Sequence, residues 1–351
     1  MSEMRSAIPR ITHFIHSNFL LLLVMSYILA GLLPQAGLAI RQLSLGSVAL
    51  PGLGQTNLSI SLFMLAFLLF NAGLGIQTKE LANLRKQPVL LGVGFLANIL
   101  VPVILVFIFH GLLIKWHNPD ELQNLLVGLA LIAAMPIAGS SAAWAQNANG
   151  NISLSLGLVL SSTILSPLTT PWVLHFYGML TQGDYSEDLH QLAEQGTNAF
   201  LCLTVVMPSL FGIVVHQLLG EEKTAKLKPL IKLLNFITLL ALNYSNASTS
   251  LPEVFSNPDW DLLIFVFITT IVVCAMAFFA GWFISWIFKT NSADQAALMF
   301  SLGMNNNGTG LVLASSALSD HPAVLVPMIL YTLVQQVLAA GVDRYIFKSK
   351  D

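Results

Sequence analysis

Two asparagine-rich stretches, both punctuated by glycine, interrupt otherwise apolar segments of the chain. The first runs from Met135 to Asn151 and the second from Ser301 to Gly310. Lipid cannot hydrogen-bond amide groups, so polar side chains at membrane depth are tolerated where they line a cavity or contact other protein. Many transporters form their substrate sites from broken helices of this kind. The two stretches therefore predict a polar binding site inside a membrane.

The residue types in each stretch favour unwound backbone. Pro136, Gly139 and Gly150 should loosen the first helix, so that backbone groups between them face a ligand. Asn305–Asn307 form a run of poor helix formers in the second. Half-helix N-termini would favour an anionic group, and carbonyl ends would favour a cation. The side chains that we predict to contact a substrate are Asn98, Ser140, Gln146, Asn147, Asn149, Asn306 and Asn307.

A structural alternative exists for each polar residue on these segments. Small and polar residues also serve as packing faces and hydrogen-bonding contacts between membrane helices. Two such stretches at matching positions in both halves of the chain favour a site. Asn71, Gln335 and Gln336 are isolated polar residues on apolar segments, where a hydrogen bond to a neighbouring helix is an equally good explanation.

The composition is that of a polytopic membrane protein. Apolar residues make up 55% of the 351 residues and charged residues only 9%. The net charge is −2 and no long basic run occurs, which excludes nucleic acid as a partner. Cys202 and Cys274 are the only cysteines, and their spacing is not that of a metal site. The first apolar run has full membrane length, so we interpret it as a retained span rather than a cleaved signal.

The apolar segments predict an all-α fold of ten transmembrane helices, since a span needs about 20 apolar residues. The first five candidates are residues 17–34, 57–76, 88–112, 124–148 and 152–176. The second five are residues 198–219, 229–247, 261–288, 293–317 and 322–347. Five spans per half imply two inverted repeats, residues 1–176 and 198–351, with the fourth and ninth spans broken and crossing.

The basic residues orient this topology. With ten spans and both termini inside, only Arg41 and Lys115 of the fifteen basic residues lie on the outer side. The acidic connection from Thr181 to Thr197 also lies outside. This distribution satisfies the positive-inside rule. We therefore predict an integral protein of a bacterial inner membrane, with both termini in the cytoplasm.

Several activities lack the residues that they need. Proton antiport of the usual kind needs a carboxylate at midplane, whereas Asp294 and Asp343 lie near the ends of predicted spans. Proteolysis needs a nucleophile with its base or a zinc motif, and the sequence contains neither pattern. We predict that the protein is not an enzyme and uses no cofactor.

The chain resembles the bile acid:sodium symporter family. The most specific pieces are Phe70–Ile76 (FNAGLGI), the stretch from Pro136 through Asn151 to Pro167, and Gly303–Asn306 (GMNN). The resemblance implies a core domain of spans 3–5 and 8–10, with the fourth and ninth spans as broken, crossing helices. It also implies a panel domain of spans 1, 2, 6 and 7, with alternating access by motion between the two domains.

The resemblance also implies sodium ligands. Ser141 and Ser155 stand at serine-ligand positions, while Met304 offers a backbone carbonyl and Asn305 a side-chain amide. Three positions depart from the family pattern. They are Ala142 in place of an asparagine, Val159 in place of a threonine, and Ser301 in place of a glutamate shared by two ions. Losing that carboxylate argues against two sodium ions but leaves room for one, because an anionic substrate could supply the missing charge.

The leading hypothesis is a secondary active transporter of a small organic solute, with an anion as the expected class and sodium as a candidate coupling ion. The first alternative is a receptor or scaffold that kept the carrier fold after losing ion ligands. The short inner connections argue against it, because they carry no signalling domain. The second alternative is an arsenite extruder of a related fold, which the fourth span disfavours because it contains no thiol.

Overall fold

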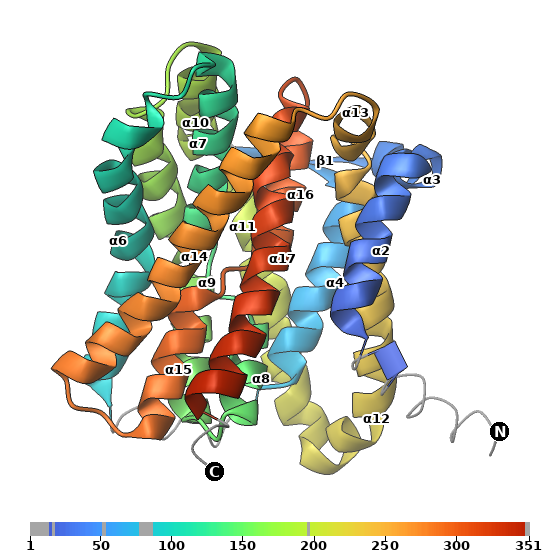
Figure 1. Ribbon diagram of the computed structural model, residues 1–351. Helices are drawn as coiled ribbons and strands as arrows, with labels where there is room; N and C mark the ends of the chain where they lie inside the picture. The colour runs from blue at the N-terminus through green and yellow to red at the C-terminus, as the bar shows by residue number, and fades with distance from the viewer. Residues whose placement is uncertain (1–13, 16–17, 51–53, 77–86, 195–196, 348–351) are drawn as a thin grey trace.

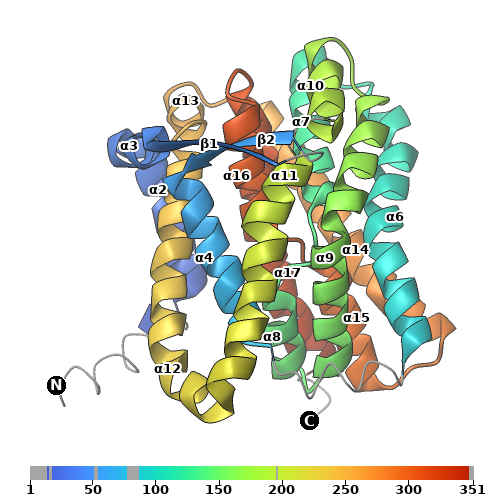
Figure 2. The ribbon, with the colours of Figure 1, turned by 180° about the vertical axis from the view of Figure 1, so that it is seen from behind.

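The computed structural model describes residues 14–15, 18–50, 54–76, 87–194 and 197–347. These residues form a bundle of helices that divides into two groups, because the helices of each group contact mainly one another. Both groups can be followed in Figure 1 and, from behind, in Figure 2. We call them the first and the second helix group. The described ends of the chain, at α2 and after α17, lie at the same end of the bundle as α8.

The first helix group consists of α2, α4 and α12. Their bounds are α2 Phe19–Leu32, α4 Ile60–Leu74 and α12 Met207–Ala247, with α11 Thr197–Leu201 and η2 Cys202–Val206 running into α12. Gly220, with φ 78°, divides α12 into two arms, because only glycine adopts this conformation without strain. Gly73 of α4 and Gly212 of α12 each face the partner helix's backbone so closely that a Cβ would collide with a carbonyl oxygen. The two helices therefore need glycine at their interface.

The second helix group contains four long helices and two pairs of short ones. The long helices are α6 Pro88–Leu113, α9 Ile152–Gly178, α14 Trp260–Ile287 and α17 Leu325–Val342. The short pairs are α7 Pro119–Ala134 with α8 Ser140–Asn147, and α15 Ser292–Gly303 with α16 Asn307–Ala317. The same order, a long helix, a broken pair and a long helix, thus occurs twice. The inverted relation between residues 1–176 and 198–351 remains a prediction.

Smaller elements connect the helices at the end opposite α8. They are α3 Gln35–Gln42, β1 Ser44–Leu50, β2 Gly54–Ser59, α10 Asp184–Glu194, α13 Leu251–Ser256 and η3 Pro322–Val324. One further short element, η4 Asp343–Phe347, follows α17 at the α8 end. The antiparallel hairpin β1–β2 corrects the all-α prediction, since the fold is nearly but not entirely helical. Its segment is rich in glycine, serine and threonine, which are poor helix formers. Ser59 then caps α4 by accepting a hydrogen bond from the backbone N–H of Leu62.

Among the residues that the structure describes, five helical segments are long and apolar enough to cross a membrane, and six if the bent pair α2 and α3 is counted as one span. Residues 197–247 form one of the five segments although they contain two predicted spans. The polytopic membrane class is thereby confirmed. The full number of ten remains a prediction, because α4 and the members of the broken pairs are too short to qualify alone.

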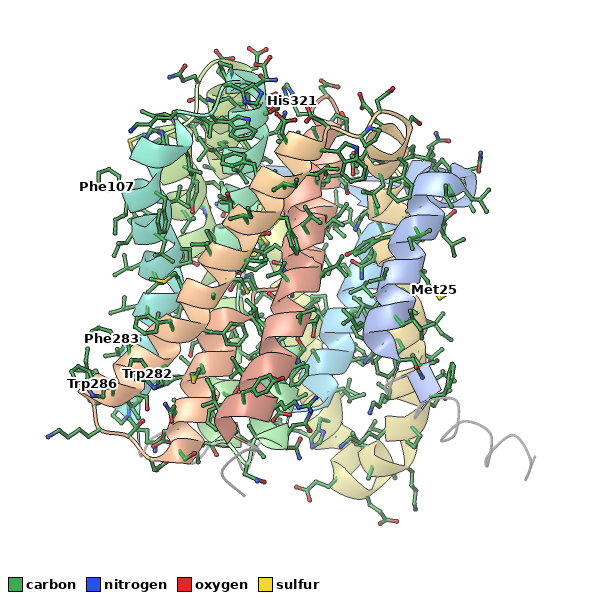
Figure 3. All side chains as sticks on the ribbon, in the orientation of Figure 1. Met25, Phe107, Trp282, Phe283, Trp286 and His321 are labelled. Carbon is green, nitrogen blue, oxygen red and sulfur yellow. The ribbon has the colours of Figure 1, made fainter. Side chains whose placement is uncertain are left out.

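Large apolar side chains cover the outside of the bundle. Phe107, Phe283, Trp286 and Met25 project away from the helices in Figure 3, and the side chains of Phe107 and Trp286 are 63% and 65% exposed. Such exposure is unfavourable in water but normal against lipid hydrocarbon. The exposed faces agree with the membrane assignment.

Candidate substrate site at the crossing of two broken helices

The break between α7 and α8 spans residues 135–139. Pro136 lies in it, and Thr170 on α9 donates a hydrogen bond from its hydroxyl to the Ala134 carbonyl that the missing helix turn leaves free. The predicted unwound stretch reached to Gly150, and this part of the prediction is wrong. Residues 140–147 are helical because, with alanine and tryptophan among them, they bury one face against the second helix group.

The break between α15 and α16 is shorter. Only Met304, Asn305 and Asn306 lie outside the two helices, within the predicted stretch. Asn306 caps α16, since its side-chain oxygen accepts a hydrogen bond from the N–H of Thr309. The asparagines thus stop one helix and start the next.

The two breaks cross each other and are hydrogen-bonded. The Ala138 N–H donates to the Met304 carbonyl at 2.9 Å, and the Asn306 N–H donates to the Pro136 carbonyl at 2.8 Å. Ile137 and Asn305 form an antiparallel bridge between these bonds. Each unwound strand therefore satisfies backbone groups of the other, as it must inside a membrane.

Asn305 is the centre of a buried polar network. Its amide nitrogen donates to the Ile132 carbonyl at 3.0 Å, and its side-chain oxygen accepts from Asn98 at 3.3 Å. Gln335 on α17 accepts from the Asn305 N–H at 3.0 Å and donates to the Asn305 carbonyl at 3.3 Å. The amide of Asn307 donates to the same Gln335 oxygen at 3.3 Å. Asn98 and Asn305 therefore hold the crossing in place.

A cavity of about 360 Å³ adjoins the crossing and is lined by residues of both helix groups. The first helix group contributes mainly apolar side chains to its wall, among them Phe19, Leu65 and Phe236, together with Asn235 and Asn243. The second helix group contributes polar residues. These are Ser140, Asn305, Asn306, Asn307, Thr332, Gln335 and Gln336, and Gly139 also lines the cavity.

The electrostatics of this cavity come from backbone rather than from charged side chains. No charged residue lines it among the described residues. Two helix N-termini do, that of α8 at Gly139 and Ser140 and that of α16 at Asn306 and Asn307. No side chain caps α8, so the first N–H groups of this helix have no side-chain acceptor. The positive ends of two helices therefore meet at one uncharged cavity.

The predicted sodium ligands lie beside the crossing, deep in the second helix group. Ser155 on α9 and Ser301 on α15 are fully buried, with their hydroxyl oxygens 3.2 Å apart. Ser141 on α8 is also fully buried, and its hydroxyl has no hydrogen-bond partner among the described residues. Helices α8, α9 and α15 contact one another, so three hydroxyls are carried by one helix cluster. The Met304 carbonyl already accepts the bond from Ala138, and the Asn305 side chain is engaged by Asn98.

Four predicted substrate contacts are not brought to the cavity. Gln146 and Asn147 lie exposed in the last turn of α8, and Asn149, with φ 53°, lies exposed in the turn after it. Asn98 is buried on α6 behind the crossing rather than at the cavity wall. Ser140, Asn306 and Asn307 do line the cavity.

Sequence reasoning missed Gln335, Thr332, Asn235 and Asn243 as cavity residues. Each is a single polar residue on an apolar segment, a pattern that does not distinguish a site from a contact between helices. Proximity to a second polar residue is the distinguishing property, and it appears only in the fold. Asn71, for example, donates to Asn235 at 2.7 Å and thus fixes a cavity residue.

The carboxylate of Asp294, in the first turn of α15, is held in a hydrogen-bond network. It accepts hydrogen bonds from the amides of Asn151 and Gln87, at 2.7 Å and 3.2 Å. These bonds join α6, α9 and α15 at the α8 end of the bundle. In the described part of the chain, no three histidine, cysteine or acidic side chains come together as a metal site.

The chain is similar in sequence to several known proteins. YbaS of Bacillus subtilis is 29% identical over 215 residues, which is 61% of this chain and 66% of YbaS. The sodium-dependent transporter YocS of the same organism is 22% identical and covers 74% of this chain and 75% of its own length. Sodium/bile acid cotransporter 7-B of Xenopus laevis is 23% identical over 81% of both chains.

A family model covers nearly the whole chain. The model of the SBF-like CPA transporter family matches residues 17–344, which include both broken helix pairs and every cavity residue. Members of this family are transporters rather than enzymes. The resemblance drawn from the FNAGLGI and GMNN segments is confirmed, and the chain belongs to the SBF-like CPA transporter family of bile acid:sodium symporter type.

Proposed function

We propose that this protein is a secondary active transporter that moves a small organic anion by alternating access. The observation that carries the proposal is the meeting of two helix N-termini at an uncharged cavity between the two helix groups. A helix N-terminus carries roughly half a positive charge and unpaired N–H donors, which together form an anion site. At the start of α8 no side chain accepts from the first N–H groups, although the Ser141 N–H donates to the Ala138 carbonyl at 3.0 Å, whereas the Asn306 side chain occupies the Thr309 N–H of α16.

Two further features favour an anion with an apolar part. The wall from the first helix group is largely hydrophobic, with Phe19 and Phe236 in ring contact at 5.6 Å. Lys232 lies near this wall, with its ammonium nitrogen 5.8 Å from the centre of the Phe236 ring. A carboxylate or similar group would bind at the helix N-termini and its hydrocarbon part against the aromatic wall.

One sodium ion is the proposed coupling ion. The hydroxyls of Ser141, Ser155 and Ser301 provide neutral oxygens, and the hydroxyl of Ser141 is a buried group in need of a partner. Hard cations such as sodium prefer oxygen ligands, as is known for calcium and magnesium. Since Ser301 supplies no charge, a bound anion would offset the ion, and each would favour the binding of the other.

Transport requires the cavity to open to each side in turn. We propose that the second helix group is the moving core and the first is the panel, with ten spans related as inverted repeats. The face that carries α8 and the bend of α12 would lie in the cytoplasm of a bacterial cell, according to the positive-inside rule.

Solute counterflow in proteoliposomes tests the proposal. Purified protein is screened for stabilisation by organic anions, and the best one is used as the labelled solute with and without sodium. We expect exchange of labelled for unlabelled anion, stimulated by sodium. Counterflow of organic cations but not anions would refute the anion assignment. Binding of an anion without any exchange would favour a receptor.

A further inference from the structure

A second cavity, of about 290 Å³, lies at the α10 and α13 end of the bundle, away from the crossing. Its wall is formed by α7, by α13 and the connection that follows it, by α14, and by η3 with α17. None of its residues belongs to the crossing cavity. It therefore requires an explanation of its own.

The charged residues of this wall are all acidic. Glu121, Glu253 and Asp259 line the cavity, and no lysine, arginine or histidine does so among the described residues. The Glu121 carboxylate is held by the indole N–H of Trp116 at 2.7 Å and by the amide of Asn118. Asp259 accepts from the Leu262 N–H and so caps α14. The carboxylates are thus kept at the wall, where they create a negative potential.

Two buried oxygens in the wall lack hydrogen bonds. The side-chain oxygen of Asn124 and the hydroxyl of Ser250 have no partner among the described residues, and Ser250 is only 3% exposed. An amide oxygen accepts hydrogen bonds and cannot donate them. Leaving such a group buried and unpaired is unfavourable, so it is normally paired. The missing partner must be a hydrogen-bond donor.

The rest of the wall is apolar and the cavity is much larger than an ion. The hydrophobic residues are Leu125, Leu262, Leu263, Val266, Val326 and Pro327. In the described part of the chain, the carboxylates do not come together as a metal site. A ligand that fits must therefore combine positive charge, N–H donors and a hydrocarbon body. We propose that this cavity binds an organic ammonium ion with a short apolar chain.

The position of the cavity suggests what binding would do. α13 follows directly on α12 and contacts α2, so it moves with the first helix group. α7, α14 and α17 belong to the second. An ammonium ion in the cavity would contact both groups and hold them together at this end. Since alternating access separates them in turn, occupancy would slow exchange without entering the substrate site.

Binding is measured with hexylammonium as the probe on the purified full-length chain. We expect a saturable rise in the thermal unfolding temperature at millimolar concentrations, because the probe binds only the folded state. Hexan-1-ol has the same hexyl chain with a hydroxyl in place of the ammonium group, and heptanoate carries that chain on a carboxylate. They should give a much smaller shift.

Variants locate the site. Replacing two carboxylates together, Glu253→Gln with Asp259→Asn, should weaken hexylammonium binding about tenfold, since each partly exposed charge contact contributes up to about 1 kcal/mol. The matched control changes two acidic residues of α10 outside the cavity, Glu187→Gln with Asp184→Asn. This control should bind within about twofold of the unaltered protein.

A third variant provides a separate test in case the double variant does not fold. Asn124→Leu removes the unpaired oxygen together with the exposed hydrogen bond that the Asn124 amide donates to the Asp120 carbonyl at 3.1 Å. The two losses oppose each other, so the variant should fold with a stability close to that of the unaltered protein and bind hexylammonium more weakly. Three results would each overturn the proposal. They are no hexylammonium shift, an equal shift with hexan-1-ol, or undiminished affinity in both cavity variants. None of these results depends on the identity of the transported solute.

Discussion

Gln335 should contribute more to the free energy of unfolding than its neighbour Gln336, although the two are adjacent on one apolar helix. The amide of Gln335 is 3% exposed and makes three hydrogen bonds to the unwound strand, two to the backbone of Asn305 and one to Asn307. Gln336 is half-buried and accepts one long bond, from the indole of Trp144 at 3.4 Å. The same substitution, to methionine, removes the hydrogen bonds in both cases and keeps the side-chain length.

The expected difference follows from these bonds. A hydrogen bond between membrane helices contributes about 0.6 kcal/mol on average, so three contribute about 2 kcal/mol. Gln336→Met should cost no more than about 0.5 kcal/mol, because its single bond is long. Methionine would be buried at position 335 and half-buried at position 336, so its transfer offsets more of the loss at 335 and the hydrogen bonds set the upper limit of the difference. The difference of about 1.5 kcal/mol corresponds to roughly a tenfold change in the unfolding equilibrium.

Reversible unfolding of the two variants in mixed micelles measures this difference. Transport is measured in parallel, because loss of Gln335 should also release the Asn305 strand that borders the cavity. We expect Gln335→Met to lower substrate affinity more than Gln336→Met does, since both side chains line the cavity but only Gln335 also bonds the Asn305 backbone. Equal destabilisation of the two variants, or a Gln335→Met variant as stable as the unaltered protein, would refute the role assigned to this network.

Three other predictions test the ion, the anion and the helix packing. Ser155→Ala with Ser301→Ala should abolish sodium-dependent stabilisation measured against potassium, and a retained sodium effect would place the ion elsewhere. Ser140→Asp should raise the KM for an anion about thirtyfold relative to Ser140→Asn. The reason is that a like charge about 6–8 Å away costs about 2 kcal/mol at an effective dielectric constant near 20. Unchanged uptake would argue against binding at the α8 N-terminus. Gly73→Ala should cost about 1–3 kcal/mol through collision with the Ser209 carbonyl, whereas Gly92→Ala, with open space around it, should cost none; thermal unfolding decides between them.

The extent of what could be predicted differs between the spans and the site. Hydropathy located the long helices closely; the predicted span 152–176, for example, corresponds to α9 at Ile152–Gly178. Poor helix formers located the break at Asn305. The first break was predicted too long, because residues 140–147 form a helix whose buried face, with Ser141, Ala142 and Ala145, is defined by its neighbours. Local propensity contains no information about those neighbours.

The chain alone determined that the protein crosses a membrane, that two of its helices are broken, and to which family it belongs. These properties follow from apolar length, from proline, glycine and asparagine at particular positions, and from short motifs. Only the tertiary structure decided that Ile137 bridges Asn305 and that Gln335 holds the unwound strand. It also decided that Asn147 lies far from the cavity that Asn307 lines. The physical reason is that a polar group's role depends on which partner satisfies it, and in this bundle the partners are distant in sequence.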